Sequence, residues 1–121
     1  MARILAVDDS QTMRQLVSFA LSEVGHEVHD AEGYDAAVAL ANLHHFDIVI
    51  SDLNMPGKNG IELVKTLRTL PHTRFVPILM LTTESQTKLR DAAKLAGATG
   101  WLVKPFQPVQ LVDVVSKVLR I

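Results

Sequence analysis

The stretch VISDLNMPGKNG, residues 49–60, joins an apolar run to a carboxylate and then to a turn. Residues 48–50 (IVI) have the continuous apolar character of a strand buried on both faces, which is typical of a parallel sheet. Asp52 follows this run closely, although burying a carboxylate costs free energy unless a partner compensates for it. Pro56-Gly57 then predicts a turn, and a helix is expected over residues 60–70. We therefore ask what makes a carboxylate tolerable at the end of a buried strand, and what it does there.

The rest of the chain alternates short apolar runs with amphipathic segments. Strands are predicted over residues 3–8, 26–31, 47–52, 76–82 and 101–103. Helices are predicted between a cap at Ser10 and a stop at Gly25, over residues 34–43, 60–70 and 87–96, and from Pro108 to the C-terminus. Five strands alternating with five helices indicate an α/β fold, a doubly wound parallel sheet with helices on both faces. The weak alternation in residues 26–31 places that strand at an edge. The side chains expected in or near the core include Met13, Phe19 and Met80.

Composition and charge exclude several classes of protein. The chain has 121 residues, 48% of them hydrophobic, which predicts a single domain over residues 1–121 with no attached output domain. A net charge of −1 with interspersed signs provides no electrostatic surface for nucleic acid or an anionic membrane. The chain has no cysteine, so disulfides and thiolate metal sites are excluded. No stretch approaches the ~20 apolar residues of a membrane span, and a soluble, cytoplasmic protein is expected.

Reactive side chains follow four of the five predicted strands. Asp8 and Asp9 end the first strand, Asp52 the third, Thr82 the fourth and Lys104 the fifth. Because the carboxyl ends of parallel strands meet at one rim, these side chains are expected to lie close together. Crowded carboxylates repel one another, which raises their pKa values or requires a cation, and Mg²⁺ fits oxygen ligands of this kind best. A carboxylate nucleophile, a metal, a lysine and a hydroxyl together predict a phosphoryl-accepting site with Asp52 as the acceptor.

Each of these residues alone has a simpler interpretation. The two acids after the first strand could cap a helix, Asp52 could open the following turn, and a lysine or a strand threonine is ordinary. Their coincidence at one edge of the sheet favours a site. Residues 52–63 also resemble a calcium-binding loop, but Pro56 and Leu63 occupy the fifth and twelfth places, where ligands are needed. A calcium loop is therefore rejected.

The motifs that contain these residues resemble the receiver domain of two-component response regulators, especially its chemotaxis-type (CheY-like) members. The motifs are VDDS (7–10), ISDLNMPGKNG (50–60), ILMLTTES (78–85) and AGATGWLVKPF (96–106), and the resemblance spans the whole chain. It implies a flavodoxin-like (βα)5 fold with strand order 2-1-3-4-5. It also implies that Asp52 takes a phosphoryl group from the phosphohistidine of a sensor histidine kinase (CheA-like).

The resemblance also assigns roles at the rim. The implied Mg²⁺ ligands, direct or through water, are Asp8 or Asp9, Asp52 and the backbone carbonyl of Asn54. Mn²⁺ is expected to substitute for Mg²⁺. Lys104 is expected to pair with the phosphoryl group, and the Lys104-Pro105 peptide bond to be cis.

A switch is implied in the same way. Thr82 is expected to move toward the phosphoryl oxygen, and Trp101, at a position where Tyr or Phe is commoner, to turn inward behind it. Thr83 stands where Ala or Gly is frequent, and its bulk is expected to slow access to the site. Asn54 and Glu84 match the chemotaxis-type pattern, which favours a short-lived phosphoryl group.

The resemblance places an output face on the fourth helix, the fifth strand and the fifth helix. Its members are expected to include Trp101, residues 87–96, and the exposed Gln110, Asp113 and Lys117. This face is expected to bind a flagellar motor switch or another output protein, with the chain acting as a monomer in chemotaxis or motility signalling.

Three other functions remain to be weighed. A small aspartyl-phosphate hydrolase would typically carry Asp-x-Asp after the first strand, whereas the order here is Asp8-Asp9-Ser10. A flavin-binding domain would need a neutral phosphate loop at the same place, and two aspartates would repel the phosphate. A phosphorelay intermediate or phosphate sink would use the same site chemistry with a different partner, and that alternative stays open.

Overall fold

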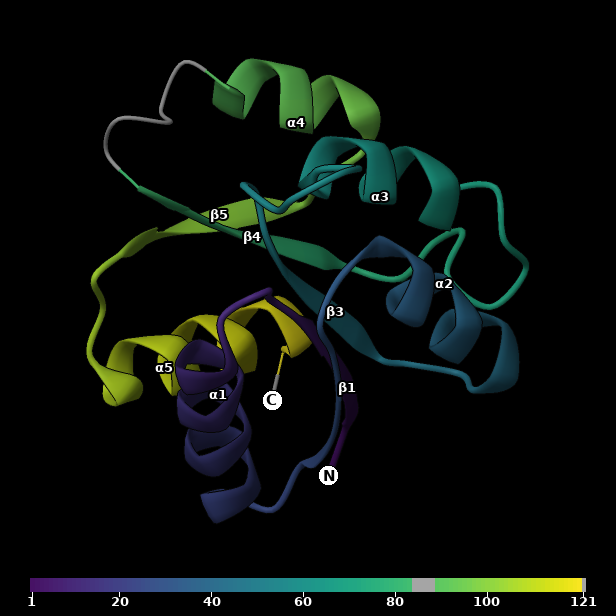
Figure 1. Cartoon of the computed structure of the whole chain (residues 1–121). Coiled ribbons are helices and arrows are strands. Elements are labelled where there is room, and N and C mark those ends of the chain that lie inside the picture. The colour runs from purple at the N-terminus through teal and green to yellow at the C-terminus, as the bar shows by residue number, and fades with distance from the viewer. Residues whose placement is uncertain (84–88, 121) are drawn as a thin grey trace.

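The computed structural model describes residues 1–83 and 89–120 and shows one five-stranded sheet with helices on both faces (Figure 1). The elements in chain order are β1 (Arg3–Val7), α1 (Gln11–Glu23), β2 (Glu27–Ala31), α2 (Tyr34–Leu43), β3 (Ile48–Asp52), α3 (Gly60–Leu67), β4 (Ile78–Thr83), α4 (Arg90–Ala96), β5 (Gly100–Lys104) and α5 (Pro108–Leu119). The strand order is β2-β1-β3-β4-β5, and all paired strands are parallel. The predicted fold class and strand order are confirmed, including the edge position of β2.

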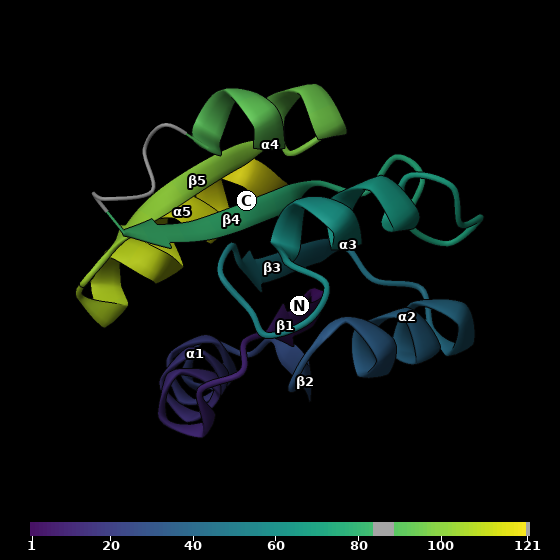
Figure 2. The same ribbon diagram turned by 45° about the horizontal axis from the view of Figure 1, so that its top comes forward.

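Successive side chains of each central strand enter two different cores, as the period of two along a strand requires. Figures 1 and 2 show α1 and α5 on one side of the sheet, and α2, α3 and α4 on the other. The core against α1 and α5 contains Ile4, Ala6, Ile48, Ile50, Leu79 and Leu81. The core against α2, α3 and α4 contains Leu5, Val7, Val49, Ile78 and Met80. Burial on both faces explains why β1, β3 and β4 are continuous apolar runs.

Local signals determine where several helices begin and end. Ser10 caps α1, its hydroxyl accepting the backbone N–H of Met13 at 3.2 Å, and Gly25 follows the helix with φ of 91°. Pro108 occupies the first turn of α5, where its missing N–H costs nothing. The Lys104-Pro105 peptide bond is cis, as the sequence resemblance implies.

Two predictions about individual segments need correction. Phe19 is 69% exposed, because α1 buries the neighbouring stripe of Val17, Ala20 and Leu21 and leaves Phe19 outside it. The helix predicted over residues 60–70 ends at Leu67. In the described part of the chain, α4 begins at Arg90. Residues 84–88, Glu84 among them, are not part of what the structure describes.

Arg68 joins the end of α3 to the end of α4. Its guanidinium donates to the carbonyl of Gly97 through Nε and Nη2, at 3.1 and 2.7 Å. Nη1 of the same guanidinium donates to the carbonyls of Thr73, Arg74 and Val76. Burial lowers the pKa of Arg68. These contacts fix the C-terminal end of α4 to the core of the domain.

His26 is a buried polar residue outside the rim. Its Nδ1 accepts the backbone N–H of Ala2 at 3.1 Å, which requires that this nitrogen carry no proton. Burial, and to a lesser extent the positive N-terminus, lowers the pKa of His26. Within residues 1–83 and 89–120, no helix combines the length and apolar character needed to cross a membrane.

Candidate functional site

Three carboxylates meet at the carboxyl edge of the sheet. Asp8 follows β1 directly and Asp52 is the last residue of β3; both are buried, with 3% and 5% of their surface exposed, whereas Asp9 is exposed. One oxygen from each of the three lies within 4.8 Å of the others. Among the residues that the structure describes, no other group of three or more metal-ligating side chains comes this close. The predicted convergence of the strand ends is confirmed for these three acids.

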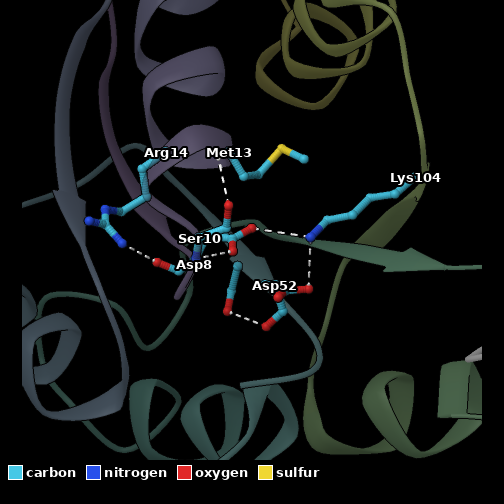
Figure 3. A network of polar contacts seen from close by, with 7 residues as sticks. Asp8, Ser10, Met13, Arg14, Asp52 and Lys104 are labelled. Atoms are coloured by element: carbon cyan, nitrogen blue, oxygen red, sulfur yellow. Dashed lines mark hydrogen bonds and ion pairs between the residues drawn. The ribbon is translucent and has the colours of Figure 1, made fainter. Parts of the chain in front are cut away.

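Lys104 places a cation between two of these carboxylates. Its Nζ lies 3.2 Å from Asp8 Oδ2 and 3.2 Å from Asp52 Oδ1, as Figure 3 shows. Lys104 is the last residue of β5, two strands away from β3 and three from β1, so only the folded sheet brings the three side chains together. The side chain of Lys104 is 18% exposed, and the ion pairs are therefore shielded from most of the solvent.

The pKa of Asp52 is raised despite this lysine. Burial is the largest cause, and the charge of Asp8 is the second. The charge and hydrogen bond of Lys104, and a hydrogen bond from the backbone of Asn54, act in the opposite direction. One lysine therefore compensates only partly for two buried carboxylates. The charged form of Asp52 is therefore less favourable in the folded protein than in water, and a further cation at the cluster would stabilise it.

The donor set fits Mg²⁺. Hard divalent cations take carboxylate and carbonyl oxygens, and Mg²⁺ is commonly held by one or two carboxylates with retained waters. Asp8, Asp9 and Asp52 supply such oxygens at close range, and exposed Asp9 leaves one side of the cluster open to solvent.

The loop between β1 and α1 is held by contacts that the sequence pattern did not reveal. Asp8 Oδ1 accepts the backbone N–H of Ser10 at 2.9 Å, and the Asp8 carbonyl accepts Arg14 Nη1 at 2.7 Å (Figure 3). Arg14 also pairs with Asp30 of β2 at 3.0 Å. Arg14 thus links α1 and β2 to the backbone of Asp8. This contact helps to fix the position of the residue that carries the carboxylate.

The other side of the rim is formed by close backbone packing. The N–H of Gly60, the first residue of α3, donates to the carbonyl of Leu53 at 2.9 Å. A Cβ atom at Gly60 would lie 2.5 Å from the carbonyl oxygen of Asp52 and 2.9 Å from Cα of Leu53. Glycine is therefore required for α3 to approach Asp52 this closely.

Thr82 lies one residue beyond Leu81, the β4 residue that pairs with Asp52. Its side chain is 1% exposed, and its hydroxyl has no hydrogen-bond partner in the described part of the chain. A buried hydroxyl without a partner is unusual and costs free energy. Among the described residues, Thr82 therefore has a hydrogen-bonding group that is not used, one position beyond the residue of β4 that pairs with Asp52.

The remaining predicted site residues lie farther from the carboxylates. Thr83 is half-buried and pairs with Lys104 across β4 and β5. Trp101 lies three residues before Lys104, opposite Met80, and packs half-buried against the core under α3 and α4. Glu84 lies outside the described residues. The structure thus gathers Asp8, Asp9, Asp52 and Lys104 at one point and places Trp101 apart from them on β5.

A doubly wound α/β sheet with an acidic cluster and a lysine at its carboxyl edge is the arrangement expected of a receiver domain. Comparison with known proteins agrees with this class. Residues 4–116 match the family model of the response regulator receiver domain. The chain is 36% identical to chemotaxis protein CheY of Pseudomonas aeruginosa, over 98% of this chain and 96% of that protein. The structure of chemotaxis protein CheY4 of Vibrio cholerae matches with a TM-score of 0.93 and 47% identity, over 98% of each chain.

The chain also matches longer regulators. It is 36% identical to the phosphate regulon transcriptional regulatory protein PhoB of Escherichia coli, over 98% of this chain but 52% of that protein, so it spans about half the length of these relatives. The chain belongs to the response regulator receiver family, and its fold is the CheY-like arrangement.

Proposed function

We propose that this receiver accepts a phosphoryl group on Asp52 from a histidine kinase in a Mg²⁺-dependent reaction, and then binds an output partner. The observation that carries the proposal is the position of Asp52, a buried carboxylate of raised pKa that lies close to Asp8 and shares the ammonium of Lys104 with it. In this proposal the chain is a signalling protein that takes part in its own phosphorylation and dephosphorylation.

The chemistry assigns one task to each residue. A carboxylate oxygen of Asp52 forms the bond to phosphorus as the bond between phosphorus and the histidine nitrogen breaks, and the imidazole leaves with the electron pair. Mg²⁺, held by Asp8, Asp9, Asp52 and the carbonyl of Asn54, would neutralise charge on the phosphoryl oxygens. Lys104, already 3.2 Å from Asp52, would pair with one of those oxygens.

The hydroxyl of Thr82, which has no hydrogen-bond partner within residues 1–83 and 89–120, supports a role in switching. In the proposed phosphorylated state it donates a hydrogen bond to a phosphoryl oxygen, and Trp101 turns inward behind it. A hydrogen bond to a charged group contributes about 1.5–3 kcal/mol. Moving a two-state equilibrium from 1% to 99% needs about 5.5 kcal/mol, so Thr82 needs help from Lys104 or from a bound partner.

The choice of partner rests on the relatives. Since the chain corresponds to nearly the whole length of proteins named for chemotaxis, we assign it to chemotaxis or motility signalling in the cytoplasm, with a CheA-like kinase upstream. The exposed residues Gln110, Asp113 and Lys117 of α5, together with α4 and β5, form the proposed output face. A flagellar motor switch or a similar output protein is the proposed target.

Acetyl phosphate with Mg²⁺ tests the assignment of Asp52. Intact mass should show one added phosphoryl group in the wild type and in Asp113→Asn, an exposed control on α5, and none in Asp52→Asn. Undiminished labelling of Asp52→Asn would show that another residue is the acceptor. Capture of partners with and without beryllofluoride, a mimic of the phosphoryl group, then separates a motor-type target from a phosphorelay partner.

A further inference from the structure

Arg90 lies over the ring of Trp101. It is the first residue of α4, and its guanidinium carbon is 5.0 Å from the centroid of the indole of Trp101 on β5. A guanidinium within about 6 Å of an aromatic centroid is attracted by the electrons of the ring, and tryptophan is the strongest partner of this kind. Arg90 is half-buried, so solvent weakens this attraction only in part.

Apart from this ring and the neighbouring acid Asp91, the described part of the chain offers the guanidinium of Arg90 little stabilisation. A cation in the first turn of a helix opposes the helix dipole, and α4 has no side-chain hydrogen bond at its N-cap. The Nε–H of Arg90 is buried and finds no acceptor among the described residues. A buried donor without a partner costs free energy. The ring of Trp101 is therefore the main favourable contact that the structure describes for this guanidinium.

Trp101 is placed where a movement would break this contact. It pairs with Met80 of β4. Thr82 lies two residues after Met80 on the same strand, so its side chain is on the same face of the sheet as those of Met80 and Trp101. The far end of α4 is fixed, because Arg68 donates twice to the carbonyl of Gly97. If the indole moves inward toward Thr82 while α4 stays attached at Gly97, it leaves the guanidinium behind.

We propose that Arg90 is a positioning residue that holds Trp101 in its half-buried place and so opposes the switch. This inference rests on the proposed function, since it takes Thr82 and Trp101 to move together on phosphorylation. An interaction made in only one of two states shifts their equilibrium by its own free energy. The contact between Arg90 and Trp101 therefore raises the threshold for activation, and its loss favours the phosphorylated conformation.

Four proteins test this role: the wild type, Arg90→Met, Arg90→Lys and Lys65→Met. Arg90→Met keeps an aliphatic side chain and removes the cation, and Lys65→Met removes the same charge from an exposed position of α3, outside the output face. The emission of Trp101, the only tryptophan, reports on the ring while beryllofluoride is titrated in the presence of Mg²⁺.

Arg90→Met should bind the mimic about two- to fivefold more tightly than the wild type, which is the scale of an exposed to half-buried cation–π contact. Its emission before the mimic is added should already be shifted toward that of the mimic-bound wild type. Arg90→Lys should give an intermediate affinity, since an ammonium keeps part of the attraction. Lys65→Met should behave as the wild type.

Equal or weaker binding of the mimic by Arg90→Met would overturn the inference, and so would an equal gain in Lys65→Met, which would make net charge the cause. If Arg90→Met does not fold, Arg90→Lys decides: affinity equal to that of the wild type contradicts the role. Labelling by acetyl phosphate is measured on the same wild-type sample. Failure of that labelling contradicts the proposed function and the inference with it, whereas normal labelling with unchanged Arg90 variants contradicts the inference alone.

Discussion

Replacing Gly60 with alanine should destabilise the domain and impair the site at Asp52. The new Cβ would lie 2.5 Å from the carbonyl oxygen of Asp52, 2.8 Å from Cε of Met80 and 2.9 Å from Cα of Leu53. The end of the Met80 side chain can move away, but the two backbone atoms belong to Asp52, which ends β3, and to Leu53, which follows it, and they cannot. The start of α3 must therefore shift away from Asp52.

The size of the effect follows from these contacts. Overpacking in a dense interior typically costs about 1–3 kcal/mol, and collision with backbone places Gly60→Ala at the upper end of that range. The higher helix propensity of alanine returns at most about 1 kcal/mol, so a net loss of about 2–3 kcal/mol is expected. For a domain of this size, that corresponds to a fall in melting temperature of roughly 10 °C.

Thermal and urea unfolding measure this loss, and phosphoryl uptake from acetyl phosphate measures the displacement of Asp52. Gly100→Ala is the matched control, because a Cβ there meets its nearest atom, Cδ1 of Leu79, at 3.9 Å. That variant should be neutral or stabilised by about 0.4–1 kcal/mol. A stability of Gly60→Ala within about 0.5 kcal/mol of the wild type would refute the close packing of α3 on β3.

Three further predictions concern charge. Mg²⁺ at millimolar concentration should raise the melting temperature by mass action, and much less in Asp9→Asn; an unchanged wild-type curve would contradict a metal site. The pKa of Asp52 is higher in the folded protein than its ordinary value of 3.8. The folded protein therefore loses stability as the pH rises from 3.8 through the pKa of the folded state. With a chelator at pH 7, Asp52→Asn should therefore be more stable than the wild type in urea unfolding, and a destabilised variant would be evidence against this cost. The lowered pKa of His26 means that stability falls as pH drops below its ordinary value of 6.5 and levels off below the folded value. His26→Asn, which can still accept the N–H of Ala2, should flatten that fall, and an unchanged pH profile would assign the slope to other groups.

Much of the fold and the centre of the site could be predicted from the sequence. The apolar runs that end in Asp8, Asp52 and Lys104 identified the strands, and the geometry of a parallel sheet then required their ends to meet. The structure confirms this with ion pairs of 3.2 Å. Such predictions succeed because a strand buried on both faces leaves a clear apolar pattern, and a polar side chain at its end is conspicuous.

Contacts that depend on how helices pack could not be predicted in the same way. Among the described residues, Arg68 donates only to backbone carbonyls, which have no sequence signature. The approach of Arg90 to Trp101 depends on how α4 lies over β5. Phe19 was misplaced because an apolar residue beside the buried stripe of α1 looks the same in sequence as one within it. The contact of Arg14 with the backbone of Asp8 was missed for the same reason as that of Arg68.

The ion pair between Asp8 and Lys104 joins residues that are 96 positions apart in the chain. During synthesis, both buried carboxylates leave the ribosome long before the lysine that stabilises them. Contacts between such distant residues form late, because the intervening chain must be ordered first. A nascent or truncated polypeptide thus has repelling acids and no counter-ion at the rim, and the proposed phosphoryl acceptance is restricted to molecules whose last strand has joined the sheet. The site in this way distinguishes chains that have folded through β5 from chains that have not.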